Sequence, residues 1–508
     1  MPTLPALTLD LLLVALLVFL GLRIVHLMAP GITWLESLGV SLPLGAGSLT
    51  YAVFLLSWMG IPVSLGSFSA AGLVLLAFAE AASRWKRGVE ETAVGENRRS
   101  GGAGENRLAR WCLWIVMAAL AVVTTLISVG RSHTLWDAAA IWAAKGYGIA
   151  LEGTIFAAKR WGAHAAAYPL NIPLLISMFQ LADGDVLPGS KLVFPLFFVS
   201  TLFGIAGFWR RLRVPDLWVL VGIVLTATIP EVFRHATYGY ANIPLATYLV
   251  LGALWGARGL RTGRVRYTIL AGSLLSLAIW TRVEGVLYVA AILAPFLVSW
   301  AWARLDRLHL LALFAPIAVV GLPWLSFFLT NGISGSQTGG AMAAAIEHWR
   351  LGDFRWNDLR LILGYLRRSL LHTEVWGLLF PTSVGLLALR WRRFLDRAVP
   401  EIMILGVAAL TTGIATVGLF YVGSYVKDGL FAWLTRSFPR AFFPSAILLA
   451  TIAFSAIAGE GMRRAGDSSG TAAAPSPLDH GREPDVAPPT AEAGGVARTA
   501  TLRPVSSS

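Results

Sequence analysis

The sequence predicts an all-α, polytopic membrane protein, and three observations indicate this fold class. Of the 508 residues, 56% are hydrophobic and only 14% are charged, whereas ordinary globular proteins carry about 25% charged residues. The mean hydropathy is +0.67. The apolar residues are gathered in blocks of about 20, the length of helix that crosses the hydrocarbon core of a bilayer. A bundle of membrane-spanning helices accounts for all three observations.

The apolar blocks predict 13 transmembrane helices. They cover residues 9–29, 37–59, 61–82, 111–130, 188–209, 217–232, 243–258, 267–282, 284–302, 309–329, 376–390, 399–422 and 441–459. A further apolar stretch, 171–181, is too short to cross a bilayer. We expect it to form an interfacial or re-entrant helix on the outer side, because counting it as a crossing would move the basic loop at 210–213 to the outside.

Basic residues gather in four loops between the apolar blocks, which accounts for the net charge of +13. The loops contain Arg84, Lys86, Arg87, Arg98, Arg99, Arg107 and Arg110; Arg210, Arg211 and Arg213; Arg258, Arg261, Arg264 and Arg266; and Arg390, Arg392, Arg393 and Arg397. The positive-inside rule places all four in the cytoplasm, and with 13 crossings the C-terminus lies there too. No nucleic-acid-binding module is recognisable, so we expect no nucleic acid partner. The single cysteine, Cys112, excludes an intramolecular disulfide.

Composition divides the chain into four parts. They are a three-helix membrane segment at 1–82, a flexible cytoplasmic loop at 83–110, a membrane module at 111–459 and a disordered cytoplasmic tail at 460–508. The loop and the tail cannot bury enough apolar surface to offset their ordering entropy. The outer segments long enough to build a site are 131–187, 330–375 and 423–440. The second of these predicts amphipathic helices on the outer face, suited to recognising an acceptor.

The first outer segment contains a carboxylate at a chemically useful depth. From Trp136 the pattern predicts an amphipathic helix with Asp137, Ile141 and Lys145 on one stripe. Trp136 and Trp142 suit a helix that lies along the lipid headgroups. A carboxylate there can accept a proton from a sugar hydroxyl or hold a divalent cation against a phosphate. Spacing alone slightly favours the alternative, a solvated aspartate stabilised by the helix dipole.

The same segment resembles a known family. The pattern Trp136-Asp-Ala-x-x-Ile-Trp-x-x-Lys, followed by His164-x-x-x-Tyr168-Pro-x-x-x-Pro-Leu, resembles the first outer loop of the GT-C membrane glycosyltransferases. The branch most similar to it contains bacterial proteins like the dolichyl-phosphate-mannose–protein mannosyltransferases. The resemblance extends from about Trp111 to Gly459. It implies a GT-C-like helical bundle in which Asp137 is catalytic and accepts the proton of the acceptor hydroxyl.

Two later segments also resemble this family. His235-Ala-Thr-Tyr-Gly-Tyr240-Ala-Asn242-Ile-Pro resembles the second outer loop, where relatives often carry Gly-Tyr-Ala-Asp. The amide at Asn242 binds cations weakly, which argues against a two-carboxylate metal site. Thr-Arg282-Val-Glu284-Gly resembles the Lys-x-Glu-Gly turn at an outer helix junction. Arg282 can grip a donor phosphate bidentately, and the equal alternative is an Arg282–Glu284 pair that closes the hairpin.

The last outer loop of the family resembles residues 428–444. There Arg440 is expected to begin a helix at headgroup depth, a position suited to a phosphate contact, with snorkelling to the lipid surface as the alternative. Lys145 is expected about 12 Å along its helix from Asp137, so both can line one cavity without pairing. A donor-phosphate role and a plain interfacial anchor are both open for Lys145.

The remaining candidates are expected to bind the sugar or the acceptor. They are Trp136, His164, Tyr168, Tyr240, Asn242 and Glu284. A lone histidine near a turn is more often structural, so that alternative stays open for His164. No motif names a cofactor; a divalent cation remains open, and the metal ligands are unknown.

The resemblance implies an inverting glycosyltransferase in the cell membrane, acting on the outer, periplasmic face. It would take a sugar from a polyprenyl-phosphate donor and pass it to a glycan, lipid or protein acceptor. Asp137 would draw the acceptor proton while Lys145, Arg282 and Arg440 stabilise the departing lipid phosphate. A lipid-linked glycan transporter would need ionisable residues at mid-helix, and few are found there. A non-catalytic subunit of a cell-envelope glycan assembly would tolerate loss of Asp137.

Overall fold

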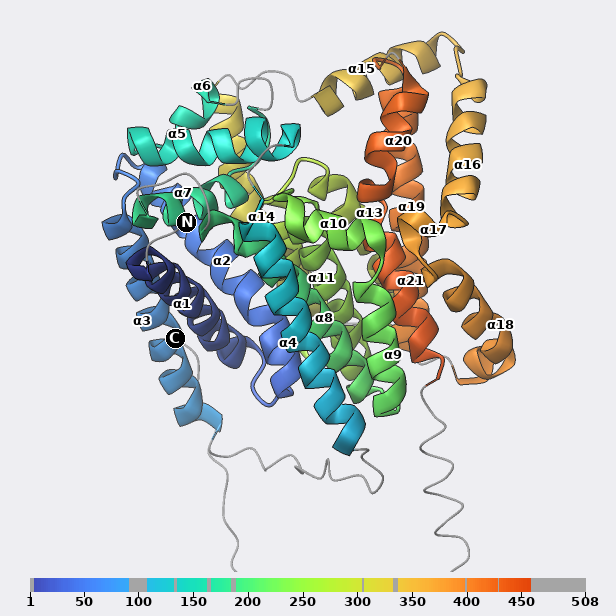
Figure 1. The fold of residues 1–508 in the computed structure, drawn as a ribbon, viewed down its shortest axis with the longest axis horizontal. Coiled ribbons are helices and arrows are strands. Elements are labelled where there is room, and N and C mark those ends of the chain that lie inside the picture. The colour runs from blue at the N-terminus through green and yellow to red at the C-terminus, as the bar shows by residue number, and fades with distance from the viewer. Residues whose placement is uncertain are drawn as a thin grey trace, which may run out of the picture. The chain divides into compact units, whose positions relative to one another are not determined.

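The protein is an all-helical bundle in a computed structural model that describes residues 4–90, 107–131, 135–161, 166–183, 189–303, 306–331, 337–397, 400–427 and 429–457 (Figure 1). Within these ranges every regular element is a helix, and no strand occurs. Residues 1–462 form one compact unit. The predicted all-α class is therefore confirmed. The predicted tail at 460–508 lies outside the described residues.

The helices follow one another in a nearly continuous succession. The first half contains α1 (Leu4–Met28), α2 (Trp34–Trp58), α3 (Leu65–Glu90), α4 (Arg107–Val129), η1 (Asp137–Ala143), α5 (Ala144–Glu152), α6 (Ala157–Arg160), α7 (Asn171–Asp183), η3 (Gly189–Lys191), α8 (Val193–Arg211), α9 (Asp216–Ala227) and α10 (Pro230–Tyr238). The second half contains α11 (Asn242–Thr262), α12 (Val265–Ile279), α13 (Gly285–Ala303), α14 (Arg307–Thr330), α15 (Gln337–Arg350), α16 (Trp356–Leu370), α17 (Thr373–Trp376), α18 (Leu379–Arg397), α19 (Pro400–Gly423), α20 (Leu430–Ala441) and α21 (Phe443–Ser455).

Eight of the described helices are long and apolar enough to cross a membrane. They belong to α1, α2, α3, α4, α8 (together with η3), α11, α14 and α19. The bent pairs α9–α10 and α20–α21, with bends of 64° and 45°, raise the number to ten if each pair is one span. Helices α12, α13 and α18 occupy the other three predicted ranges but are shorter apolar helices. The protein is thus a polytopic helical membrane protein by length and composition, and the number of 13 crossings stays a prediction.

The three N-terminal helices pack directly on the rest of the bundle. Helix α2 is buried along most of its length between α1 and α8. Glycines allow this close approach, because a Cβ atom on Gly39 would lie 2.5 Å from the backbone nitrogen of Gly204 in α8. A Cβ atom on Gly21 or Gly45 would likewise collide with the backbone of the facing helix in the α1–α2 pair. Small residues at such positions are typical of helix pairs in membranes.

Helix α7 lies inside the bundle. It has 13 residues, which is short of a bilayer crossing. Its side chains are almost entirely buried, and α5 packs across it so closely that a Cβ atom on Gly146 would collide with Ile176. The predicted helix therefore exists, and protein surrounds it, which fits the re-entrant alternative better than the interfacial one. The predicted loop at 83–110 is also shorter than expected, since α3 continues to Glu90 and α4 begins at Arg107; residues 91–106 lie outside the described part of the chain.

An arginine–glutamate cluster joins four helix ends. Glu36 near the start of α2 accepts hydrogen bonds from Arg211 at 3.1 Å and from Arg258 at 2.9 Å. Glu401 near the start of α19 accepts from Arg211 at 2.8 Å and from Arg261 at 2.7 Å. Both carboxylates are buried. The sequence predicted these arginines in loops, whereas they lie in the last turns of α8 and α11, and the pattern of basic residues gives no sign of the two glutamates that hold them.

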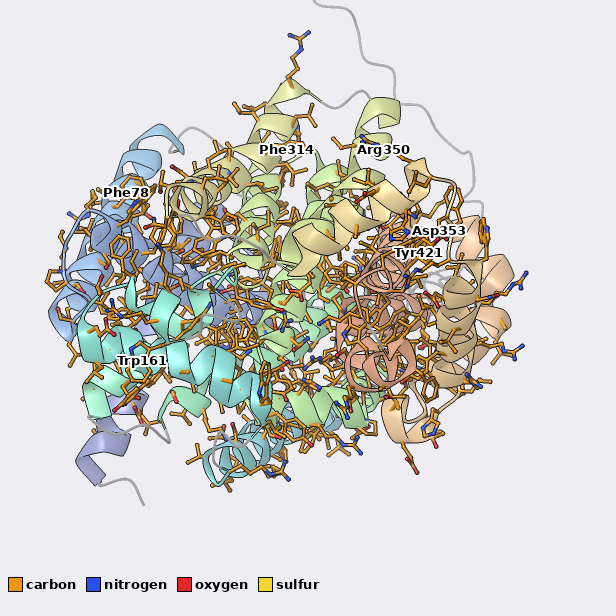
Figure 2. The ribbon with its side chains drawn as sticks, turned by 90° about the horizontal axis from the view of Figure 1, so that it is seen from above. Phe78, Trp161, Phe314, Arg350, Asp353 and Tyr421 are labelled. Atoms are coloured by element: carbon orange, nitrogen blue, oxygen red, sulfur yellow. The ribbon has the colours of Figure 1, made fainter. Side chains whose placement is uncertain are left out.

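The segments predicted to form the site gather at the other end of α11 and α19. Helix α11 begins beside the site and carries Arg258 and Arg261 in its last turns, whereas α19 begins at the arginine–glutamate cluster and ends beside the site. Helices α5, α10, α15 and α20 lie at this end (Figure 1). Seen from above, Asp353 and Tyr421 lie close together where α15 meets the end of α19, joined through the hydroxyl of Tyr425 (Figure 2).

Candidate functional site

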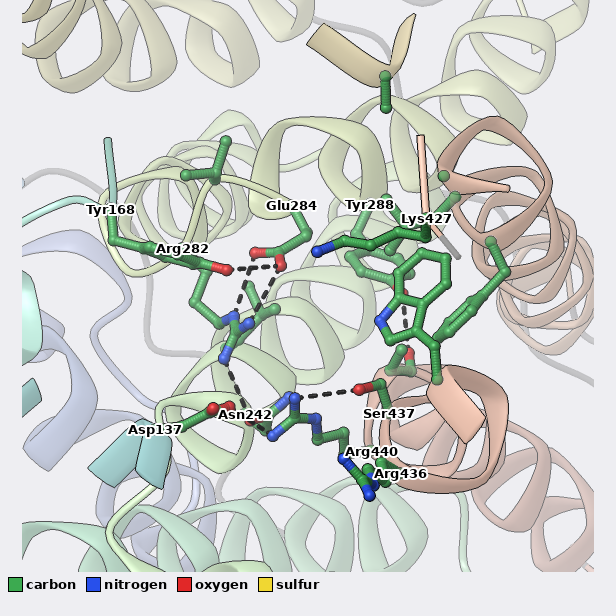
Figure 3. Close-up of a pocket in the computed structure, with 18 of the residues that line it drawn as sticks. Asp137, Tyr168, Asn242, Arg282, Glu284, Tyr288, Lys427, Arg436, Ser437 and Arg440 are labelled. Carbon is green, nitrogen blue, oxygen red and sulfur yellow. Dashed lines mark hydrogen bonds and ion pairs between the residues drawn. The ribbon is translucent and has the colours of Figure 1, made fainter. Parts of the chain in front are cut away.

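A cavity of about 480 Å³ lies among η1, the 166–168 loop, the start of α11, the α12–α13 turn, α15, the end of α19, α20 and the start of α21. Its polar lining consists of Asp137, Tyr168, Asn242, Arg282, Glu284, Tyr288, Lys427, Arg436, Ser437 and Arg440 (Figure 3). These residues come from segments that are up to 303 positions apart in the sequence. A cavity of this size into which polar groups converge is typical of a small-molecule site.

Asp137 and Arg440 form an ion pair at the cavity wall. Arg440 Nη1 donates to Asp137 Oδ2 at 2.5 Å, and both side chains are 18% exposed. Arg440 Nη2 donates to the hydroxyl of Ser437 at 3.1 Å. The guanidinium also lies over the ring of Tyr240, 5.4 Å from its centroid. Tyr240 therefore supports Arg440 from behind and does not line the cavity, so its predicted substrate contact is not what the structure shows.

Arg440 lies in the last turn of α20, where the sequence had predicted the start of a helix. Pro444 occupies the first turn of α21, and a proline suits that position because its missing N–H has no partner there. The bend of 45° between α20 and α21 follows directly after Arg440. The predicted favourable helix N-terminus is therefore absent at this residue, and Arg440 acts through its guanidinium alone.

A π-helix presents Asp137 to the cavity. Residues 137–143 form η1, whose backbone hydrogen bonds span five residues instead of four. Asp137 and Ile141 line the cavity, whereas Lys145, which follows in α5, does not. Trp136 remains on the lining, whereas Trp142 is completely buried. The expectation that Trp142 faces lipid headgroups is therefore wrong.

Arg282 is locked in a second network of the cavity lining. Its Nε and Nη2 donate to the two oxygens of Glu284 at 3.1 and 3.0 Å, and its Nη1 donates to Asn242 at 3.1 Å. The Tyr168 hydroxyl donates to Glu284 at 3.3 Å. The negative charge of Glu284 raises the pKa of Tyr168 above its usual value. Burial also raises it, and other neighbouring charges contribute less. Of the two interpretations left open by the sequence, the Arg282–Glu284 pair that closes the turn is the one observed.

Lys145 is buried behind the cavity and does not line it. Its ammonium donates to the backbone carbonyl oxygens of Tyr168 at 3.3 Å and Ala166 at 3.5 Å. Burial lowers the pKa of Lys145 to about 7. This position is a correction to the predicted contact with a donor phosphate, because the lysine instead holds the loop that carries Tyr168. His164, in the same segment, lies outside the described residues.

Four polar residues of the lining were not predicted as site residues from the sequence. Lys427 and Arg436 add cationic groups, and Ser437 supports Arg440. In Figure 3 Lys427 points into the cavity. Tyr288 lines it from α13. Arg436 could have been found, because it precedes Arg440 by four residues and positions i and i+4 share one face of a helix. Lys427 carries no comparable signal.

The cavity has a cationic wall and an apolar wall. Among its lining residues two carboxylates, Asp137 and Glu284, stand against four cationic side chains on Arg282, Lys427, Arg436 and Arg440. The apolar wall comes mainly from α19 and α20 and includes Phe420 and Trp433. Among the described residues no group of three or more His, Cys, Asp or Glu side chains could hold a metal ion. Each lining carboxylate already pairs with an arginine, so this set of groups suits an anionic ligand better than a cation.

The arrangement can perform two chemical tasks. Arginine side chains bind phosphoryl groups through paired N–H donors, and they stabilise negative charge that develops there. A carboxylate in the same cavity can accept a proton from a hydroxyl group. Comparison of the chain with protein-family models, curated proteins and solved structures finds no match to any of them.

Proposed function

We propose that the protein is an inverting membrane glycosyltransferase of the GT-C type that transfers a sugar from a polyprenyl-phosphate donor to a hydroxyl group. The observation that carries this proposal is the cavity itself, in which Asp137 lies beside the cationic face of α20. The acceptor is a glycan, a lipid or a protein. Thirteen crossings and a site on the outer face of the cell membrane belong to the same proposal.

The reaction requires one proton transfer and one displacement at carbon. The acceptor oxygen forms a bond to the anomeric carbon while Asp137 takes its proton. The bond from the anomeric carbon to the phosphate oxygen breaks, and its electron pair leaves on the polyprenyl phosphate. Arg440 and Arg436 stabilise the negative charge that grows on this leaving group. A general base contributes roughly 10²–10⁴-fold to such a step.

The walls of the cavity favour a donor that is both anionic and apolar. The cationic side chains supply contacts for a phosphate, whereas Phe420 and Trp433 supply an apolar surface beside it. The cavity also lies where long apolar helices end, the depth at which a lipid carries its phosphate. A water-soluble nucleotide sugar would have no use for the apolar wall.

The direct test is turnover of synthetic farnesyl-phosphate sugars by the purified protein in nanodiscs. Mass spectrometry would follow farnesyl phosphate released in the presence of a panel of hydroxyl acceptors. We expect release from at least one sugar, and loss of that release in Asp137→Asn. If the protein binds every donor but cleaves none, it is a carrier or a non-catalytic subunit, and the proposal fails. The same holds if Asp137→Asn releases farnesyl phosphate as fast as the wild type.

A further inference from the structure

Asp137 and Arg440 form an ion pair with each other in the structure. Asp137 balances the charge of the Arg440 guanidinium, so a phosphate that enters the cavity competes with this carboxylate for Arg440. Yet both residues are required for transfer if the proposed function holds. An anionic ligand that binds Arg440 more strongly than Asp137 does would separate the two side chains.

One face of α20 is suited to separate them. Arg436, Ser437 and Arg440 follow one another at i, i+1 and i+4, and all three line the cavity. Arg436 is exposed, and it forms no ion pair with a carboxylate in the described part of the chain. Two guanidinium groups one helical turn apart can together hold a phosphoryl group through several N–H donors.

Arg282, the buried arginine of the lining, offers no such opportunity. Arg282 uses Nε, Nη1 and Nη2 on Glu284 and Asn242, and it is only 7% exposed. Arg440 is held by one carboxylate oxygen and one hydroxyl, and it is more exposed. Breaking a bidentate, buried pair costs more than breaking a single contact in a partly hydrated one. An incoming phosphate therefore takes Arg440 before it takes Arg282.

We propose that the α20 face formed by Arg436, Ser437 and Arg440 is a phosphoryl-binding site, and that phosphate bound there withdraws Arg440 from Asp137. Naming a lipid-linked donor as the natural ligand rests on the proposed function; the exchange itself does not. The exchange frees the carboxylate from the arginine once the donor has bound. A hydroxyl that arrives before the donor meets a carboxylate still paired with Arg440, so the donor binds first.

Binding of farnesyl phosphate to the full-length protein in nanodiscs tests the exchange without any turnover. Asp137→Asn removes the carboxylate that competes for Arg440, so we expect farnesyl phosphate to bind roughly 10-fold more tightly than to the wild type. Unchanged or weaker binding by a folded Asp137→Asn protein would overturn the exchange.

A double-mutant cycle separates the exchange from plain electrostatics. In an Arg440→Gln background, Asp137→Asn should leave the affinity for farnesyl phosphate nearly unchanged, because the contested guanidinium is gone. In an Arg436→Gln background, which serves as the matched control, the gain should persist although overall affinity is lower. If Asp137→Asn tightens binding equally in the Arg440→Gln background, removal of a negative charge explains the effect and the exchange is wrong.

A structure of the wild type with bound farnesyl phosphate tests the exchange even if Arg440→Gln does not fold. In cryo-electron microscopy of the wild type with farnesyl phosphate, Arg440 should contact the phosphate and lie beyond about 4 Å from Asp137, the usual limit of an ion pair. An intact pair with the phosphate bound elsewhere would overturn the proposal.

Binding of inorganic phosphate distinguishes free phosphate from a lipid-linked phosphate as the natural ligand. Inorganic phosphate should follow the same pattern among the variants with weaker affinity, because it lacks a chain for the apolar wall. Equal molar affinity of inorganic and farnesyl phosphate would overturn the lipid source. Exchange without any sugar release would contradict the proposed function alone, and sugar release without exchange would contradict this inference alone.

Discussion

The arginine–glutamate cluster and the cavity are built from the same kinds of side chain at opposite ends of α11 and α19, yet they have different consequences. In the cluster, Arg211, Arg258 and Arg261 converge on Glu36 and Glu401, and the two carboxylates are buried. The void that Glu36, Arg211 and Arg258 line measures only about 10 Å³. The charges there are satisfied by one another and hold four helix ends together.

In the cavity, by contrast, carboxylates neutralise only some of the arginines. Arg282 is satisfied in the same manner as the cluster arginines, but Arg440 shares a single oxygen of Asp137, and Arg436 has no ion pair with a described carboxylate. About 480 Å³ of space lies in front of these groups. An arginine therefore signals a ligand site here only where it is incompletely paired and faces open space. Residue type alone does not separate the two regions.

The largest expected effect is loss of transfer on changing Asp137. Asp137→Asn keeps the size of the side chain but removes the proton acceptor, so sugar transfer should fall by at least about 10²-fold. The matched control is Asp216→Asn, which removes a carboxylate paired with Arg210 at 3.1 Å. That variant should transfer sugar at the wild-type rate. Rates measured with saturating donor would contradict the assignment if both variants behaved alike.

Breaking the arginine–glutamate cluster should affect stability instead. Glu401→Gln leaves Arg211 and Arg261 without a charged partner on α19, and removing one member of a buried ion pair costs about 3–5 kcal/mol. Denaturant unfolding in detergent should show this loss, while the folded fraction keeps its transfer rate. Exposed Glu374 is the control, and Glu374→Gln should unfold like the wild type. A slower rate at unchanged stability would place the cluster in the site.

Arg436 should affect the donor and leave the proton transfer intact. Arg436→Gln removes a charged contact to phosphate, so the donor concentration required for half-maximal rate should rise about 10-fold while kcat changes little. Arg261→Gln, which removes an arginine from the far cluster, should leave that concentration unchanged. A fall in kcat alone would show that Arg436 acts on the chemical step.

Lys145 gives the smallest effect, a dependence of stability on pH. Because burial lowers its pKa from 10.5 to about 7, the unfolded lysine binds a proton between these values that the folded one has lost. The free energy of unfolding therefore rises with pH in this window and is independent of this group below it. The difference in melting temperature between the wild type and Lys145→Met should change with pH. From pH 7 to pH 9 the wild type should gain a few degrees relative to the variant, on the order of 2–4 °C. A constant difference would contradict the lowered pKa.

The sequence predicted the outline of the site better than its internal contacts. Trp136, Asp137, Tyr168, Asn242, Arg282, Glu284 and Arg440 all line the cavity, as expected of outer-loop residues. Lys145 does not, because its ammonium is held by the backbone carbonyl oxygens of Ala166 and Tyr168, a contact that spacing along the helix does not reveal. Tyr240 supports Arg440 from behind it. The ion pair between Asp137 and Arg440 could not be predicted either, because the two residues are 303 positions apart in the sequence.

What the sequence determines by itself is local. Apolar blocks of about 20 residues dictate a helical membrane protein, because only a helix satisfies its own backbone hydrogen bonds inside a bilayer. Basic residues at helix ends and motifs in the longer connecting segments follow from the same reasoning. Only the tertiary structure decides which arginines are neutralised: Arg258 meets Glu36, Arg282 meets Glu284, and Arg436 faces the cavity. The reason is physical, since an ion pair depends on the distance between two groups, and helix packing sets that distance irrespective of separation in the chain.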